Sequence, residues 1–381
     1  MIRRITAGAI VALGVAGIAG AEAPDRPTFT KDVLPILQEN CQTCHRPGTA
    51  GTSGMVAPMS LMTYEDARPW AKAISKAVSA EYMPPWFASD DFHGVFRNER
   101  TLTQDEIDII VKWAATGAAR GNPTDASEPK EFPAVEWYLG EPDLVVSLPE
   151  PVWVGDDVED WQPNIEIELT EEQLPEDRWM RTLEAIPGSE VVHHIVVYTN
   201  DYDAERQTDH AAARLGYSNI GGLAPGAEPS LLQDGYGIQL KKGTTLRVSM
   251  HYHKEPGPGT GTWDQSKLGF FFYDDEEAKD IKPVSIEPIG LLDFEIPPGH
   301  QNWTVGMARE FDRPIRILKY LPHMHVRGTS AEYVAYLPDG TKKDLLNIPN
   351  YDYNWQLYYE YPEPLELPAG TRVEVKMTFD N

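Results

Sequence analysis

Cysteine is nearly absent from this chain: Cys41 and Cys44 are the only two in 381 residues, so no disulfide framework holds the fold together. Positive charge is also scarce, because 33 basic residues face 59 acidic ones and the net charge is −26. Such a surface repels nucleic acid and anionic lipid headgroups. Beyond residue 20 no apolar run is long enough to cross a bilayer, so we expect no membrane span in the mature chain.

The first 23 residues are typical of a secretory signal peptide. Arg3 and Arg4 precede an apolar run, rich in glycine and alanine, from Ile5 to Gly20, and small residues follow at Ala21 and Ala23. The run is short for a membrane helix, and an uncleaved anchor is the alternative. We therefore predict a signal peptide over residues 1–23 and a periplasmic or secreted protein.

The two cysteines stand in the motif Cys41-Gln42-Thr43-Cys44-His45. Two thiols at this spacing can add to the vinyl groups of a haem, and the adjacent His45 can supply an axial nitrogen to the iron. A redox disulfide and half of a zinc site are the alternatives, but zinc needs further ligands and no other cysteine is present. The motif predicts one haem c, bound by Cys41, Cys44 and His45.

Helical spacing surrounds this motif. An apolar stripe runs from Val33 to Leu37, and Thr103 with Glu106 forms a capping box before a helix that ends near Gly117. These helices predict an all-α cytochrome c domain over residues 24–121.

We choose Met83 as the second axial ligand of the iron, because Pro84 and Pro85 after it fix the backbone. The other candidates are Met55, Met59, Met62 and His93.

After a proline-rich linker over residues 122–140, the apolar period changes from helical to two. From Leu246 to Tyr252 apolar and polar residues alternate, and further strands are expected over residues 190–198, 316–327, 331–337 and 371–379. Short strands at these spacings predict an antiparallel sandwich or barrel.

Six of the ten histidines lie in three short motifs within this region, namely His193-His194, His251-Tyr252-His253 and His323-Met324-His325. Residues i and i+2 of a strand share a face, so His323 and His325 can grip one metal ion while Met324 points away. Adjacent His193 and His194 diverge on a regular strand, so a shared ion requires a β-bulge or a strand end. Imidazole ligands suit copper, zinc or iron. Zinc hydrolysis is disfavoured, because no H-E-x-x-H motif is present.

The three motifs, in this order, resemble those of the copper type II, ascorbate-dependent monooxygenases, the family of peptidylglycine alpha-hydroxylating and dopamine beta-monooxygenases. The resemblance covers about residues 141–381, and the N-terminal block is similar to a cytochrome c module fused to bacterial members. It implies that His193, His194 and His251 hold an electron-transferring copper. His323 and His325 would hold a second, catalytic copper that activates dioxygen. His253 has no assigned role.

The implied architecture is a cytochrome c domain followed by two jelly-roll-like sandwiches, over residues 141–288 and 289–381, each contributing one copper across a cleft. The family's second copper also takes a methionine from a later strand, and no match for that ligand is found before Asn381. We therefore expect the second sandwich to be incomplete and the natural chain to continue.

The sequence thus predicts a copper-dependent monooxygenase that hydroxylates a C–H bond of a small-molecule or peptide substrate with dioxygen. Electrons would arrive through the haem from ascorbate or a redox protein. The alternatives are a haem and copper electron-transfer protein without oxygen insertion, and substrate recognition by an inactive sandwich. Arg327 is a weak candidate for binding a substrate carboxylate.

Overall fold

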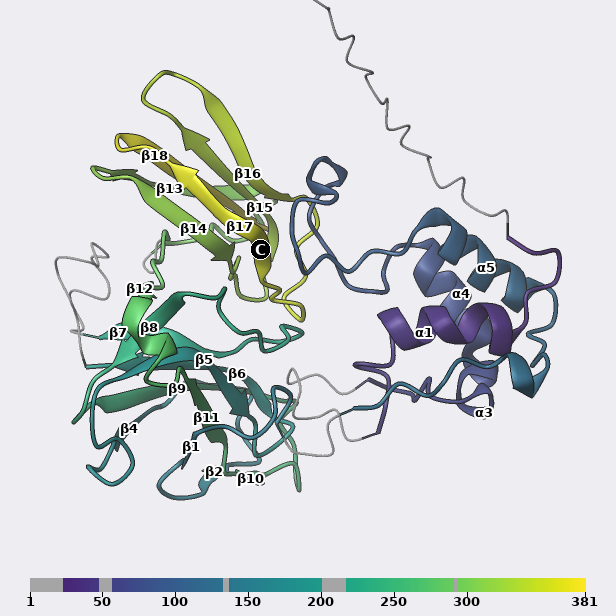
Figure 1. The fold of residues 1–381 in the computed structure, drawn as a ribbon, viewed down its shortest axis with the longest axis horizontal. Helices are drawn as coiled ribbons and strands as arrows, with labels where there is room; N and C mark the ends of the chain where they lie inside the picture. The colour runs from purple at the N-terminus through teal and green to yellow at the C-terminus, as the bar shows by residue number, and fades with distance from the viewer. Residues whose placement is uncertain (1–22, 48–56, 133–136, 201–216, 291–293) are drawn as a thin grey trace, which may run out of the picture.

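The computed structural model describes residues 23–47, 57–132, 137–200, 217–290 and 294–381. They form a helical cluster and two bodies of strands, which we call the first and second sandwich (Figure 1). The signal-peptide prediction falls on residues 1–22, outside the described range. No helix in the described segments is long and apolar enough to cross a membrane.

The helical cluster is formed by short helices around a small core. Leu37, Ile110 and Trp113 are fully buried in it. The predicted capping box is confirmed, because the Thr103 hydroxyl accepts from the amide of Glu106, whose carboxylate accepts from the amide of Thr103. The elements of this part of the chain are η1 (Phe29–Val33), α1 (Leu34–Asn40), α3 (Tyr64–Ala67), η2 (Arg68–Trp70), α4 (Ala71–Ser79), η3 (Asp90–Phe92), α5 (Gln104–Ala115) and η4 (Pro123–Asp125).

The fold-class prediction of an all-α cytochrome c domain over residues 24–121 is wrong. The described chain is mostly β, with 34% strand against 15% helix, and its helices are short. Between α4 and α5 the chain leaves the helical cluster, and Phe92 and Phe96 are buried in the core of the second sandwich. The physical reason lies in the sequence: Pro84 and Pro85 lack the amide hydrogen that a helix requires, and the aromatic residues after them pack with Tyr359 and Tyr361.

The first sandwich consists of two main sheets that share one core. One sheet has the order β1-β11-β5-β8-β12, and the other has the order β3-β9-β6-β7, with β4 also paired to β9. Met180 of β5 and Val197 of β6 are both fully buried in the core between the two sheets. The elements are β1 (Leu144–Ser147), β2 (Val152–Val154), β3 (Asp160–Trp161), β4 (Asn164–Glu168), β5 (Arg178–Ile186), β6 (Val192–Thr199), β7 (Ser218–Leu223), β8 (Tyr236–Leu240), β9 (Thr245–His253), β10 (Thr262–Asp264), β11 (Lys267–Phe272), η5 (Glu277–Asp280) and β12 (Lys282–Pro283).

The second sandwich packs a four-stranded sheet, β13-β18-β15-β16, against the pair β14-β17. The strand predicted over residues 371–379 is confirmed, but the one predicted over residues 316–327 ends at Tyr320, shortly before Pro322, which has no amide hydrogen to donate. The elements are β13 (Trp303–Phe311), β14 (Ile315–Tyr320), β15 (Gly328–Tyr336), β16 (Lys342–Ile348), β17 (Tyr359–Leu367) and β18 (Thr371–Phe379).

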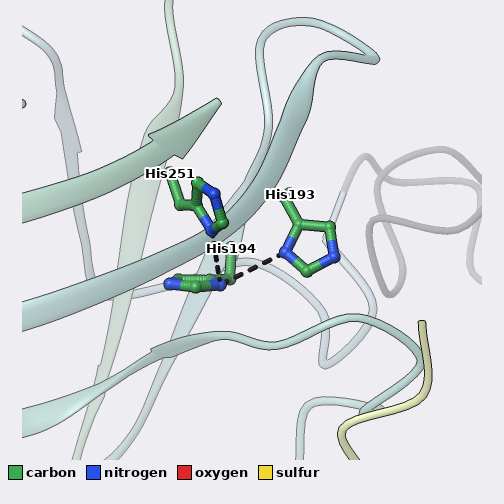
Figure 2. Close-up of side chains that lie close together, drawn as sticks. All are labelled: His193, His194 and His251. Atoms are coloured by element: carbon green, nitrogen blue, oxygen red, sulfur yellow. Dashed lines mark hydrogen bonds between the residues drawn. The ribbon is translucent and has the colours of Figure 1, made fainter. Parts of the chain in front are cut away.

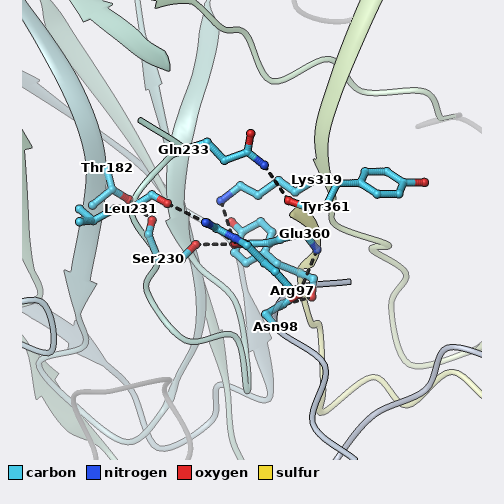
Figure 3. A network of polar contacts seen from close by, with 10 residues as sticks. Arg97, Asn98, Thr182, Ser230, Leu231, Gln233, Lys319, Glu360 and Tyr361 are labelled. Carbon is cyan, nitrogen blue, oxygen red and sulfur yellow. Dashed lines mark hydrogen bonds and ion pairs between the residues drawn. The ribbon is translucent and has the colours of Figure 1, made fainter. Parts of the chain in front are cut away.

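A polar network centred on Glu360 joins the segment before α5 to both sandwiches (Figure 3). Glu360 is 3% exposed, and its carboxylate accepts hydrogen bonds from Arg97 and from the hydroxyl of Ser230. Lys319 lies 3.7 Å from the same carboxylate. A buried charge is stable only with such partners, so this network fixes the three segments relative to one another.

Candidate metal centre

A β-bulge in β6 brings His193 and His194 to the same place. The pairing of β6 with β9 aligns Val192 with Tyr252 and then His194 with His251, so His193 is the extra residue. In a bulge the extra residue breaks the regular alternation of side chains between the two faces of the sheet, so adjacent residues can face the same place. Of the two possibilities that a shared ion allowed, a bulge or a strand end, the structure has the bulge.

Three ring nitrogens converge at this bulge (Figure 2). The Nδ1 of His194 lies 3.3 Å from the Nδ1 of His193 and 3.3 Å from the Nδ1 of His251. The three residues can each offer a ligand atom within 4.8 Å of the others, which is the spacing that one metal ion requires.

Hydrogen bonding alone cannot satisfy these nitrogens. A ring nitrogen has one in-plane position, occupied by either a proton or a lone pair, so the Nδ1 of His194 cannot bond to two other Nδ1 atoms at once. The Nε2 of His193 is buried and has no hydrogen-bond partner in the described structure. A cation held by three lone pairs resolves the conflict between the Nδ1 atoms, so the residues fit a metal.

Asp160 selects the ring nitrogen of His251 that faces the other two rings. The Nε2 of His251 lies 2.8 Å from the Asp160 carboxylate, and a proton donated there leaves the lone pair on Nδ1 facing the other two rings. His253 is exposed, and its Nδ1 lies 3.8 Å from the same carboxylate. His253 therefore lies near the Asp160 carboxylate and not among the three converging nitrogens.

Two members of the triad have lowered pKa values. Burial, followed by the charges of the neighbouring histidines, lowers the pKa of His193 to about 3 and that of His194 to about 2. A neutral imidazole carries the lone pair that a metal ligand needs.

His323 and His325 lie in the loop after β14, and Gln356 orients the first of them. The side-chain oxygen of Gln356 lies 2.6 Å from the Nδ1 of His323, and its amide nitrogen donates to the carbonyl of Tyr353. This places the proton of His323 on Nδ1 and leaves Nε2 free for a ligand. Met324 is 3% exposed and packs in the core of the second sandwich, as its predicted opposite orientation requires.

The structure brings the histidines of both sandwiches together. The ring of His194 has its centroid 5.3 Å from that of His323, and the rings of His251 and His325 are stacked with centroids 5.6 Å apart. The rings of His323 and His325 are 5.2 Å apart. All five predicted ligands therefore lie in one cluster at the boundary between the sandwiches.

Tyr353 is a site residue that the sequence analysis missed. Its ring stacks on His193 with a centroid distance of 4.2 Å and an interplanar angle of 12°, so the second sandwich covers one ligand of the first. The only sequence signal is the aromatic run Tyr351-Asp352-Tyr353-Asn354-Trp355, which follows no motif. Arg327, in contrast, is exposed, and only its carbonyl is seen in a hydrogen bond, from the amide of Asp380.

The predicted haem motif forms a turn directly after α1. The Nδ1 of His45 lies 3.1 Å from the carbonyl of Met59, an arrangement that leaves Nε2 free to ligate iron. Burial raises the pKa of Cys41 to about 12 and also raises that of Cys44, so neither has the low pKa of a redox-active thiol. With the Nε2 of His45 free and both cysteines unpaired, the residues fit a covalently attached haem.

The candidates for the second axial ligand lie in different places. Met83 is half-buried at the start of the segment that leaves the helical cluster. Met59, like Cys41, packs against the helical core. His93 is exposed and pairs with Glu99 at 2.6 Å. Met55 lies outside the described residues.

A loop of the first sandwich contacts the segment before α5 and the second histidine group. Arg100 donates to the carbonyl of Gly226, and the charges of Glu228 and Arg100 act on the pKa of Cys44. The neighbouring carbonyl, of Pro225, accepts from the amide of Gln356 at 2.7 Å. Because Gln356 also binds His323, one loop of the first sandwich touches the surroundings of both candidate sites.

No model of a known protein family matches this chain, and no curated protein matches it. Among solved structures, a protein proposed to be an alpha-L-fucosidase from Bacteroides ovatus aligns with 72% of this chain at 7% identity, with a TM-score of 0.20, and the chain spans only 39% of that protein. The PBSX exported protein XepA is similar to this chain at 8% identity and a TM-score of 0.15. The alignment covers 62% of this chain and 86% of the XepA chain. An oxalate decarboxylase is similar at 10% identity and a TM-score of 0.12. The alignment covers 63% of this chain and 77% of the decarboxylase chain. Such scores carry no argument about fold or function.

Proposed function

We propose that this chain is a copper-dependent monooxygenase that hydroxylates a C–H bond with dioxygen, and that electrons reach it through a haem attached at Cys41 and Cys44. The observation that carries the proposal is the convergence of five imidazoles from two sandwiches, with three Nδ1 atoms whose mutual contacts hydrogen bonds cannot satisfy.

The two histidine groups suit different roles. His194 and His251 are buried, and a buried three-imidazole site excludes solvent and favours electron transfer. His323 and His325 are exposed and supply only two imidazoles, so an ion there keeps open positions for exogenous molecules. Bound copper would supply one-electron chemistry with dioxygen, and the side chains hold it with neutral nitrogens.

Electron supply through haem is supported by the geometry at His45 and by the loop that contacts both regions. Haem iron would exchange one electron at a time, and His45 is oriented to ligate it through Nε2. Arg100 donates to the carbonyl of Gly226, the neighbouring Pro225 carbonyl accepts from Gln356, and the Gln356 side chain binds His323.

The test is oxygen insertion from isotopic dioxygen. We expect copper-loaded protein with ascorbate and ¹⁸O₂ to yield ¹⁸O-labelled alcohol from at least one member of a panel of amines, peptides and alkyl-aromatic compounds. His323→Ala should abolish labelling and leave the haem spectrum unchanged. His300→Ala is the matched control, because this exposed histidine packs on Trp303, outside the cluster. Full labelling by the His323→Ala protein would contradict the proposal.

A haem and copper electron-transfer protein is the second candidate. The packing of Met324 in the core favours it, because this sulfur does not share the face of His323 and His325. This candidate predicts reversible oxidation and reduction of both metals, with no oxygen uptake beyond that of ascorbate alone.

A further inference from the structure

We propose that His193, His194, His251, His323 and His325 form a single two-copper centre across the sandwich boundary, with the ions close enough to interact magnetically. The inference rests on the proposed copper function and departs from the architecture that the resemblance implies, in which each sandwich holds its own copper across a cleft.

Ring positions limit the separation of the two ions. His194 of the triad meets His323 with the ring planes at 88°, and His251 of the triad stacks on His325 at 23°. The ligand-to-metal distance of imidazole is about 2 Å. With centroids 5.3 and 5.6 Å apart, an ion bound by one group lies on a ring that directly neighbours a ring of the other group.

The donor set divides into three nitrogens and two. The three Nδ1 atoms of the first sandwich define one position. The Nε2 of His323, left free by Gln356, belongs to the second position together with His325. The unequal division gives one ion a closed site and the other an open one, so a small molecule bound at the second ion also lies beside the first.

Contacts beside the cluster fix the separation of the two positions. Gln356 is 1% exposed, binds His323 through its side chain, and donates from its backbone to Pro225 of the first sandwich. Tyr353 stacks on His193 from the other side of the boundary. The loop from Tyr351 to Gln356 therefore positions the second group against the first.

Two cations this close repel each other, and five neutral imidazoles do not offset that charge. The Asp160 carboxylate lies behind His251 and supplies one negative charge at the centre. Groups that contribute charge behind a ligand also raise its basicity. Asp160 is thus part of the centre and lowers the cost of the second ion.

The test uses the full chain and copper(II) alone, with no substrate. We expect two copper ions per chain by elemental analysis, and an electron paramagnetic resonance spectrum in which the two ions broaden or cancel each other's signals. In the His323→Ala/His325→Ala protein one copper should remain, with the sharp, full-intensity spectrum of an isolated ion. His300→Ala should retain two interacting ions.

Two results would overturn the inference. One is a spectrum of two isolated copper(II) ions with full intensity, which would place the sites apart. The other is binding of a single copper by the unsubstituted chain. Neither depends on turnover, so a protein that inserts no oxygen can still show the coupled pair, and an active protein can still show isolated ions.

Discussion

The two histidine groups are built by different means. The group of the first sandwich lies on paired strands, where a bulge and the register of β6 with β9 place His194 opposite His251. The group of the second sandwich lies in a loop, and His323 is held by one hydrogen bond to Gln356. A sheet fixes its residues through many backbone bonds, whereas a loop depends on single side-chain contacts.

This difference teaches that the first site can be complete within its own sandwich, whereas the second requires the boundary. His194 and His251 are 9% and 1% exposed, while His323 and His325 are exposed. We therefore expect substitutions in the sheet to remove a metal outright, and substitutions around the loop to alter the relation between the two metals.

The largest expected effect is that of His194→Ala, which removes the nitrogen shared by both Nδ1 contacts. Copper affinity of the triad should fall by more than about 100-fold, because even groups behind metal ligands are worth about 10–100-fold. Competition with a copper(I) chelator measures this loss, and His300→Ala should leave the affinity unchanged. Retention of wild-type affinity would show that the triad is not the site.

Gly226→Ala should separate the two groups. Gly226 has φ +73°, and an added Cβ would lie 2.2 Å from the Trp355 ring, one residue before Gln356. Crowding of this kind costs about 1–3 kcal/mol, so we expect a lower thermal unfolding midpoint and weaker magnetic interaction between the coppers.

Gly243→Ala is the control for backbone strain, because Gly243 has φ +77° but no atom within 4 Å of the added Cβ. Equal effects of Gly226→Ala and Gly243→Ala on the copper spectrum would mean that the Trp355 contact does not set the separation.

Asp160→Leu and Gln356→Leu remove the partners that fix the proton of one ligand in each group. Asp160→Leu should weaken the triad copper by about 10–100-fold and, because it removes a negative charge from the centre, the second copper to a smaller extent. Gln356→Leu should weaken mainly the copper at His323 and His325 by about 10–100-fold. Sequential copper titration followed by spectroscopy separates the two sites, and the same site being the more weakened in both variants would contradict the assignment.

The smallest expected effect is that of His253→Ala. This ring is exposed and lies 3.8 Å from the Asp160 carboxylate, so its interaction is screened by solvent. Copper affinity should change by less than about threefold, in line with a surface contact worth about 0–1 kcal/mol. A loss as large as that of His194→Ala would instead make His253 a ligand.

Local patterns in the sequence located the strands of the first histidine group, and its grouping came from the family resemblance. The alternation from Leu246 to Tyr252 gives β9, and a shared ion at adjacent His193 and His194 required a bulge or a strand end, of which the structure contains the bulge. The spacing of His323 and His325 located the second group, but it did not reveal the residues that hold these two histidines in place. Gln356 and Tyr353 reach the site through tertiary packing, and no local spacing encodes that contact.

The helical prediction failed for a related reason. The patterns around Val33 and Thr103 do mark helices, as α1 and α5 show. The residues between these helices were predicted to belong to the same domain. Phe92 and Phe96 instead find their partners more than 200 residues later, and sequence periodicity carries no information on such distant contacts.

The packing of the segment between α4 and α5 against the second sandwich affects the order of folding. Arg97 and Glu360 are 263 residues apart in the chain, and Phe96 packs against Tyr359 and Tyr361 beside them. During synthesis from the N-terminus, the segment that includes Phe92 and Phe96 emerges long before its hydrophobic partners exist. Closing so long a loop is slow. We therefore expect the second sandwich to reach its native packing last. The side chains of Phe92 and Phe96 stay exposed to solvent until then.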